Sequence, residues 1–168
     1  MLEELTAGFP ILSCILFFPV VGAVVLWLFD EEDMVRTSAL TIALVELALS
    51  VFVLLRFVPE SAAMQFTERV RWIPALGISY HLAVDGISVL FVGLTAFLTV
   101  LVVIYSWDTI RHQMKLYMMC LLALETTTMG VFVSLDLILF FVFWELMLIP
   151  SYFLIKLWGW EPSVTMPR

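Results

Sequence analysis

Five long apolar runs constrain the fold of this chain more than any other feature of its sequence. Crossing the hydrocarbon core of a bilayer takes about 20 mostly apolar residues in a helix. Of the 168 residues 63% are hydrophobic, against roughly 45–50% in ordinary soluble domains. Because one core cannot hide that much apolar surface, we expect an all-α integral membrane protein that contacts the lipid bilayer. Its five transmembrane helices are predicted over about residues 10–29, 36–58, 86–106, 116–134 and 137–157.

Polar joints separate the predicted spans and set their order across the membrane. Residues 30–36 are acidic, residues 107–115 are basic, and residues 59–85 are expected to form the longest loop. The joint at 134–136 is so short that the last two spans should form an antiparallel hairpin. Together these segments make a membrane domain over residues 1–159, followed by a short polar tail at 160–168.

The distribution of basic residues predicts the orientation of the chain. Lys and Arg gather on the inner side of membranes. If the N-terminus is outside, five Lys or Arg residues fall on the inner side of the membrane and three on the outer side. The inner set is Arg36, Arg111, Lys115, Lys156 and Arg168, and the outer set is Arg56, Arg69 and Arg71.

Charge, cysteine and histidine usage exclude several classes of function. The net charge is −7 and no block of Lys or Arg is present, so we expect no nucleic-acid partner. Cys14 and Cys120 lie far apart in apolar runs and fit no disulfide, zinc or redox motif. His81 and His112 fall in joints, whereas haem ligands in a bundle would lie inside the spans. No metal site is predicted.

Three glutamates lie near the middle of predicted spans: Glu46, Glu125 and Glu145. An acidic side chain at that depth costs about 2.5–3.5 kcal/mol on insertion scales, and such residues face a bundle interior or a wet cavity. Glu125 and Glu145 each lie ten residues from Leu135, so an antiparallel hairpin brings them to one level. Whether they face each other depends on helix rotation, which the sequence leaves open. Burial favours the neutral carboxyl, which suits loading and unloading of a proton.

The fifth span carries a polar stripe that starts at Glu145. At about 100° per residue, Tyr152 and Lys156 point within about 20° of Glu145. Pro150 lies between them and removes the hydrogen bond to the Leu146 carbonyl. A carboxyl, a phenol, an ammonium and a freed carbonyl are plausible parts of a proton path.

Each of these polar residues also has a purely structural interpretation. Lys156 would extend to the interface, and Tyr152 would fill an interfacial gap. Glu46 would hydrogen-bond a neighbouring helix. Glu125 would take hydroxyl partners from Thr126 to Thr128.

Two aspartates are expected to begin helices. Asp85 precedes the third span and is a good N-cap, although it could instead contact a partner. Asp136 should cap the fifth span.

Two segments carry a resemblance to a known family. Residues 131–159, "VFVSLDLILFFVFWELMLIPSYFLIKLWG", and 72–88, "WIPALGISYHLAVDGIS", resemble the M-type (chain 4) antiporter-like membrane subunit of proton-translocating NADH–quinone oxidoreductase, respiratory complex I. The resemblance covers about residues 1–159. The "FWELMLIP" string is closer to this subunit than to subunits of multisubunit cation/proton antiporters, which share the fold.

The resemblance implies a fold and a site. The family has about fourteen spans, with two inverted five-helix repeats. Its essential glutamate aligns with Glu145 and works with a lysine on a later broken helix. Glu125 aligns with a position where only some relatives carry a carboxylate. The parent complex would use NADH, FMN, iron–sulfur clusters and quinone, with no cofactor in this chain.

We therefore expect the N-terminal part of a proton-translocating membrane-arm subunit. It would contribute part of a proton half-channel, beside other membrane-arm subunits, in the bacterial cytoplasmic (inner) membrane. The partner lysine is not among the 168 residues, and the tail "WEPSVTMPR" does not continue like the family. We expect that the chain does not pump alone. The alternatives are a subunit of a multisubunit cation/proton antiporter, or an inert truncated scaffold in which Glu145 is merely satisfied.

Overall fold

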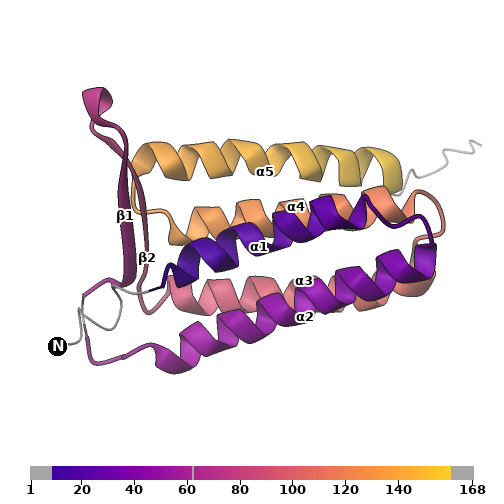
Figure 1. Cartoon of the computed structure of the whole chain (residues 1–168), viewed down its shortest axis with the longest axis horizontal. Helices are drawn as coiled ribbons and strands as arrows, with labels where there is room; N and C mark the ends of the chain where they lie inside the picture. The colour runs from indigo at the N-terminus through magenta and orange to yellow at the C-terminus, as the bar shows by residue number, and fades with distance from the viewer. Residues whose placement is uncertain (1–8, 62, 160–168) are drawn as a thin grey trace, which may run out of the picture.

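Five roughly parallel and antiparallel helices make up the body of the molecule (Figure 1). The computed structural model describes residues 9–61 and 63–159, so the polar tail expected at 160–168 lies outside the described residues. The helices are α1 (Ile11–Leu26), α2 (Glu32–Arg56), α3 (Ser88–Thr109), α4 (Met114–Val133) and α5 (Leu137–Trp158). By length and composition α2, α3, α4 and α5 can each cross a membrane, whereas α1 is a shorter apolar helix of 16 residues.

The first two helices differ most from the expected spans. α1 ends at Leu26 because residues 27–31 already turn toward α2. α2 begins at Glu32, four positions before the apolar run, since its acidic first turn suits the positive end of the helix dipole. Arg36 adds ion pairs of 3.6 Å to Glu32 and Asp33 on the same turn.

The segment expected to be a long loop contains a β-hairpin instead. β1 (Gln65–Ile73) pairs antiparallel with β2 (Ile78–Val84), with Arg69 opposite His81. A short 3₁₀ turn, η1 (Pro74–Leu76), joins them, and Gly77 follows it with a φ of 69°, which favours glycine. The hairpin stands across one end of the helices (Figure 1). Its β-branched and aromatic residues are the signal that the loop prediction missed.

A carboxylate of β1 connects the hairpin to α1. Pro10 precedes this helix and offers no capping side chain. Glu68 replaces the cap by accepting the Leu12 N–H at 2.7 Å and the Ser13 N–H at 3.1 Å. The Ser13 hydroxyl also donates to Glu68. A residue 55 positions away in the chain thereby satisfies the free backbone donors of α1.

Asp136 makes the matching connection between β2 and α5. Its carboxylate accepts the Ile138 N–H at 3.0 Å, which confirms the predicted cap, and also the Ser79 N–H at 2.8 Å. These backbone donors, Ser79 first, hold the pKa of Asp136 below its usual range. The hairpin is thus attached to the starts of two helices.

The predicted cap of α3 is also confirmed. Asp85 accepts the Ser88 N–H at 2.7 Å and the Ile87 N–H at 3.0 Å. The Ser88 hydroxyl in turn accepts the Asp85 N–H at 2.9 Å. This reciprocal pair has the form of a capping box, so the alternative of a partner contact is not needed to explain Asp85.

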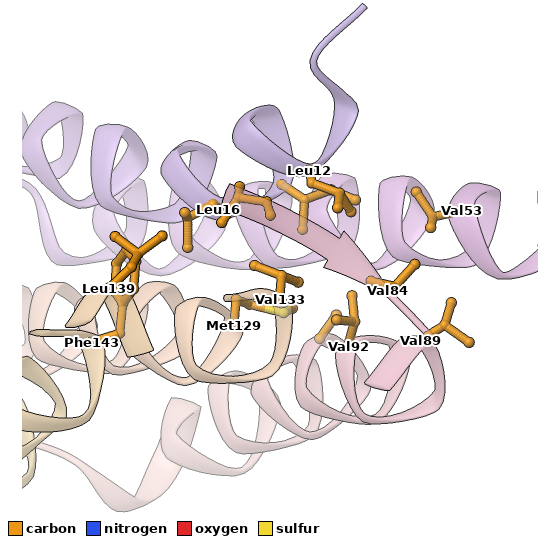
Figure 2. Close-up of a cluster of buried hydrophobic side chains, with 13 residues drawn as sticks. Leu12, Leu16, Val53, Val84, Val89, Val92, Met129, Val133, Leu139 and Phe143 are labelled. Carbon is orange, nitrogen blue, oxygen red and sulfur yellow. The ribbon is translucent and has the colours of Figure 1, made fainter. Parts of the chain in front are cut away.

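The hydrophobic core beneath the hairpin draws on all five helices (Figure 2). Side chains from helix ends that are remote in sequence meet there with the end of β2. The labelled members are Leu12, Leu16, Val53, Val84, Val89, Val92, Met129, Val133, Leu139 and Phe143. A second cluster continues the core toward the other end, between α1, α2, α3 and α4.

The end of the bundle opposite the hairpin is joined by polar contacts. Lys115 forms a 3.0 Å ion pair with Asp30. The Trp158 indole N–H donates to the His112 carbonyl at 3.0 Å. The α1–α2 joint, the α3–α4 joint and the end of α5 therefore lie together, as the alternating order of the spans requires.

Gly130 sets the approach of α4 to α5. A Cβ atom added at this glycine would overlap the ring of Phe143. Both residues are buried, and α5 packs against α4 and β2. The close approach of α5 therefore depends on the missing side chain.

We predict that Gly130→Ala lowers the free energy of unfolding by about 1–3 kcal/mol through overpacking. Gly93→Ala is the matched control, because an added Cβ meets no atom within 4 Å there, and alanine should stabilise that helix by up to about 1 kcal/mol. Thermal unfolding in detergent measures both. Equal effects of the two substitutions would contradict the packing described here.

We predict that Asp136→Ala lowers the thermal midpoint at neutral pH by a few degrees. Because the folded-state pKa is depressed, the stabilisation is present above the ordinary value of 3.8 and is lost as pH falls through the lower folded value. The difference between wild type and variant should therefore shrink below about pH 4. A difference that stays constant into this range would show that the charge of Asp136 is unimportant.

Candidate functional site

Glu145 lies on the outward face of α5, which is at the edge of the bundle (Figure 1). Its side chain is exposed, and among residues 9–61 and 63–159 it makes no hydrogen bond or ion pair. α5 buries Leu139, Phe143 and Pro150 against the rest of the chain. The glutamate therefore faces whatever adjoins this side of the five helices.

Tyr152 and Lys156 share the exposed side of α5 with Glu145. Tyr152 is 57% exposed. The Lys156 ammonium lies 5.3 Å from the centre of the Tyr152 ring, within cation–π range. α5 continues through Pro150 without a break. The three polar residues expected to form a stripe are thus all exposed, with apolar Leu148 and Ile149 exposed between Glu145 and Tyr152, and their role in proton transfer stays a prediction.

Glu125 points the other way, into the bundle, and is only 2% exposed. The Thr128 hydroxyl lies 3.6 Å from the Met147 sulfur, so Glu125 lies roughly five residues, or about 7 Å, farther from the α4–α5 joint than Glu145 rather than at the same level. The opposite orientations of Glu125 and Glu145 also exclude a direct pair within this chain. Helix rotation, which the sequence left open, decides against it.

The carboxyl neighbour of Glu125 is instead Glu46. Glu46 lies on α2 and is completely buried, with an exposed fraction of 0%. The two side chains are close enough for their charges to repel each other. They meet where α2 packs against α3 and α4. The structure thus brings together two glutamates that are 79 positions apart.

Neither glutamate of this pair has the hydrogen-bond partner that its structural interpretation requires. All four carboxyl oxygens are buried without a partner among the described residues. Thr127 and Thr128 donate to backbone carbonyls of their own helix rather than to Glu125, and the Thr126 hydroxyl is unpartnered. Thr99 of α3 lies beside Glu125, but its hydroxyl donates to the Thr95 carbonyl at 3.1 Å.

The buried face of α2 carries a signal for the Glu46 site that the sequence analysis did not use. Its buried residues are Val35, Ala39, Ala43, Glu46, Ser50 and Val53. They recur every three or four positions, and most are small. This spacing marks a packing face, so a glutamate within it belongs to the interior.

A metal centre finds no support in the part of the chain that the structure describes. No three His, Cys, Asp or Glu side chains gather there as a metal ion would need.

Comparison with solved structures defines the class of fold. The chain superposes on the Mrp complex from Dietzia sp. with a TM-score of 0.73, at 22% identity and over 93% of this chain and 17% of the other. A membrane-bound sulfane sulfur reductase, an archaeal respiratory membrane complex, matches with a TM-score of 0.69 at 20% identity over 90% of this chain and 23% of the other. The five helices thus form the antiporter-like bundle that was predicted, and the chain is a multi-pass membrane protein.

Comparison with curated sequences narrows the class to one kind of subunit. The chain is 35% identical to NADH-quinone oxidoreductase subunit M of Rickettsia felis over 92% of its length and 33% of the relative's. It is 38% identical to NAD(P)H-quinone oxidoreductase chain 4 2 of Thermosynechococcus vestitus, over 90% of this chain and 29% of the relative. F(420)H(2) dehydrogenase subunit M of Methanosarcina mazei is 32% identical over 89% and 30%. The chain is thus related to the M-type (chain 4) subunits, which confirms the resemblance.

Two further facts define the extent of this relationship. The chain spans about a third of the length of the curated relatives that it matches, which fits the expected N-terminal part. A scan against family models found no match.

We predict that Ser50→Ala leaves the thermal midpoint unchanged or raises it slightly. Its hydroxyl is buried one turn after Glu46 without a partner, so its removal lifts a desolvation penalty of about 1 kcal/mol or more. Ser13→Ala is the control, because it removes hydrogen bonds to Glu68 and to the Tyr80 hydroxyl at 2.7 Å and should cost about 1 kcal/mol. Equal losses in both variants would show that Ser50 has a partner after all.

Proposed function

We propose that this chain is part of a proton-translocating membrane-arm subunit of an NADH–quinone oxidoreductase, and that it forms one wall of a proton half-channel. Glu145 is the central proton-carrying residue. The observation that carries this proposal is the exposed stripe of Glu145, Tyr152 and Lys156 on α5. A mid-span carboxylate facing lipid is costly, so the stripe calls for protein or water opposite it.

The length of the relatives supports a protein neighbour on this face. The chain covers only about a third of each subunit M that it matches. Further helices of such a subunit would pack on the open side of α5. The family resemblance implies that one of them supplies a lysine, whose positive charge would stabilise the ionised Glu145 and be displaced when a proton arrives.

The chain's own residues would divide the transfer along α5. At about 1.5 Å per residue, the Tyr152 and Lys156 backbones lie about 10 Å and 16 Å from Glu145 along the helix. These gaps exceed a hydrogen bond, so waters on the stripe would carry the proton between groups. Lys156 is in the last turn of α5, where the helix dipole favours a positive charge. It would therefore serve the mouth of the path rather than its centre.

The proposal extends to location, partners and cofactors. The chain would lie in the bacterial cytoplasmic membrane with its N-terminus outside, beside other membrane-arm subunits. NADH, FMN, iron–sulfur clusters and quinone would belong to those neighbours. Relatives include an NADH-quinone oxidoreductase and an F(420)H(2) dehydrogenase. Related subunits thus occur with different electron donors, which supports a role separate from redox chemistry.

A subunit of a cation/proton antiporter is the second candidate, because 93% of this chain superposes on the Mrp complex with a TM-score of 0.73. Affinity purification of the chain from its native membrane separates the two. Copurifying iron–sulfur and quinone-binding subunits support the oxidoreductase, and a complex without them supports the antiporter.

We predict that Glu145→Gln in the assembled complex lowers proton pumping by about tenfold or more, because a positioned proton carrier contributes at least that much to transfer. Pumping is followed in inverted membrane vesicles with a pH-sensitive dye, and assembly on native gels. Glu60→Gln is the matched control, since Glu60 is exposed in the turn before the hairpin.

Unchanged pumping by an assembled Glu145→Gln complex would leave only the scaffold interpretation. If that variant fails to assemble, Glu145→Asp replaces it. This variant keeps the carboxyl but withdraws it by one methylene, so slowed pumping supports the channel and full pumping contradicts it.

A further inference from the structure

The interior of the bundle holds a second acidic site that the Glu145 path does not use. Glu46 of α2 and Glu125 of α4 are only 0% and 2% exposed. Their helices pack against each other, and the two side chains are close enough for their charges to interact. Their four carboxyl oxygens are shielded from solvent and have no hydrogen-bond partner among the described residues. Two unpartnered carboxyls near each other in a packed interior need an explanation other than stability.

No basic group offsets the charge of this pair. The only charge that acts on Glu46 within the described chain is that of Glu125. Arg36 and Arg56 are at the two ends of α2, and Lys115 at the start of α4 is paired with Asp30. The remaining titratable groups on the packed helices α1, α3 and α4 are Cys14, Tyr105, Asp108, Tyr117 and Cys120.

Electrostatics then determines what the site can hold. An unpaired buried charge costs several kcal/mol, and a second like charge beside it adds further repulsion. Two ionised carboxylates therefore cannot persist there together. At least one oxygen of the pair must therefore carry a proton.

We propose that Glu46 and Glu125 form a buried proton-loading site that alternates between a fully protonated pair and a singly ionised pair. In the first state both carboxyls are neutral. In the second, one glutamate is a carboxylate near a carboxyl that stays neutral, and one proton has left to water or to the next group. Each change from the first state to the second releases one proton and leaves one negative charge on the pair. Its place in transport rests on the proposed function, whereas its chemistry does not.

Infrared difference spectroscopy on the full chain in its assembled complex tests the pair directly. The carbonyl stretch of a protonated carboxylic acid is separate from that of a carboxylate and shifts in heavy water. In the wild type, part of this band should disappear reversibly as pH is raised. In Glu46→Gln and in Glu125→Gln no like charge adjoins the remaining carboxyl, so it should ionise at lower pH, and the component of the band that resists high pH in the wild type should be lost.

Glu145→Gln is the control for this measurement, because Glu145 faces away from the pair. It should keep the component that both other variants lose. If Glu46→Gln and Glu125→Gln each retain the component, the pair is overturned as a site. A carbonyl band that changes with the sodium-ion concentration rather than with pH would also overturn the proton site, since its occupant would then be a metal cation. Labelling of glutamate with ¹³C in the wild type identifies the band even if a variant does not assemble.

The same variants keep this inference separate from the proposed function. Normal pumping by Glu145→Gln together with the expected infrared changes would contradict the proposed half-channel and still support the proton site. Loss of pumping in Glu145→Gln, with a band in Glu46→Gln and Glu125→Gln that behaves as in the wild type, would do the reverse.

Discussion

The energetic cost of leaving polar groups unpaired in an apolar interior governs this structure. Helices satisfy their backbones internally, except at their first and last turns. At the hairpin end those turns are capped by carboxylates: Glu68 serves α1 from another element, Asp85 serves α3, and Asp136 serves α5 while also accepting a hydrogen bond from β2. The hairpin is therefore part of the helical framework rather than an appendage, because it supplies a cap that the residue before α1, Pro10, cannot provide.

Against this background the three mid-span glutamates are exceptions of two kinds. Glu145 is exposed on a free helix face, where a neighbour of opposite charge or a water file can reach it. Glu46 and Glu125 are enclosed without a hydrogen-bond partner among the described residues. A carboxyl of the first kind can exchange ions with another subunit or segment. A pair of the second kind can hold a proton without an outside partner.

Relatives of this chain carry names that refer to different electron donors, NADH and F(420)H(2). The similarity to structures of two further complexes extends to the fold alone, at 20–22% identity. Carboxyls in an apolar interior respond to local charge and hydration, whatever reaction alters these.

The sequence by itself determined the five helices, the caps at Asp85 and Asp136, and the stripe of Glu145, Tyr152 and Lys156, since each depends on local spacing or composition. It missed the β-hairpin, whose pairing joins residues such as Arg69 and His81 across a turn. It also left open what Glu125 faces. Only the tertiary structure decided that Glu125 meets Glu46 rather than Glu145, because helix rotation is set by packing, here by the contact of Gly130 with Phe143 and by the small residues of α2. Local pattern specifies where a carboxyl lies along a helix, and the surrounding helices specify what it faces.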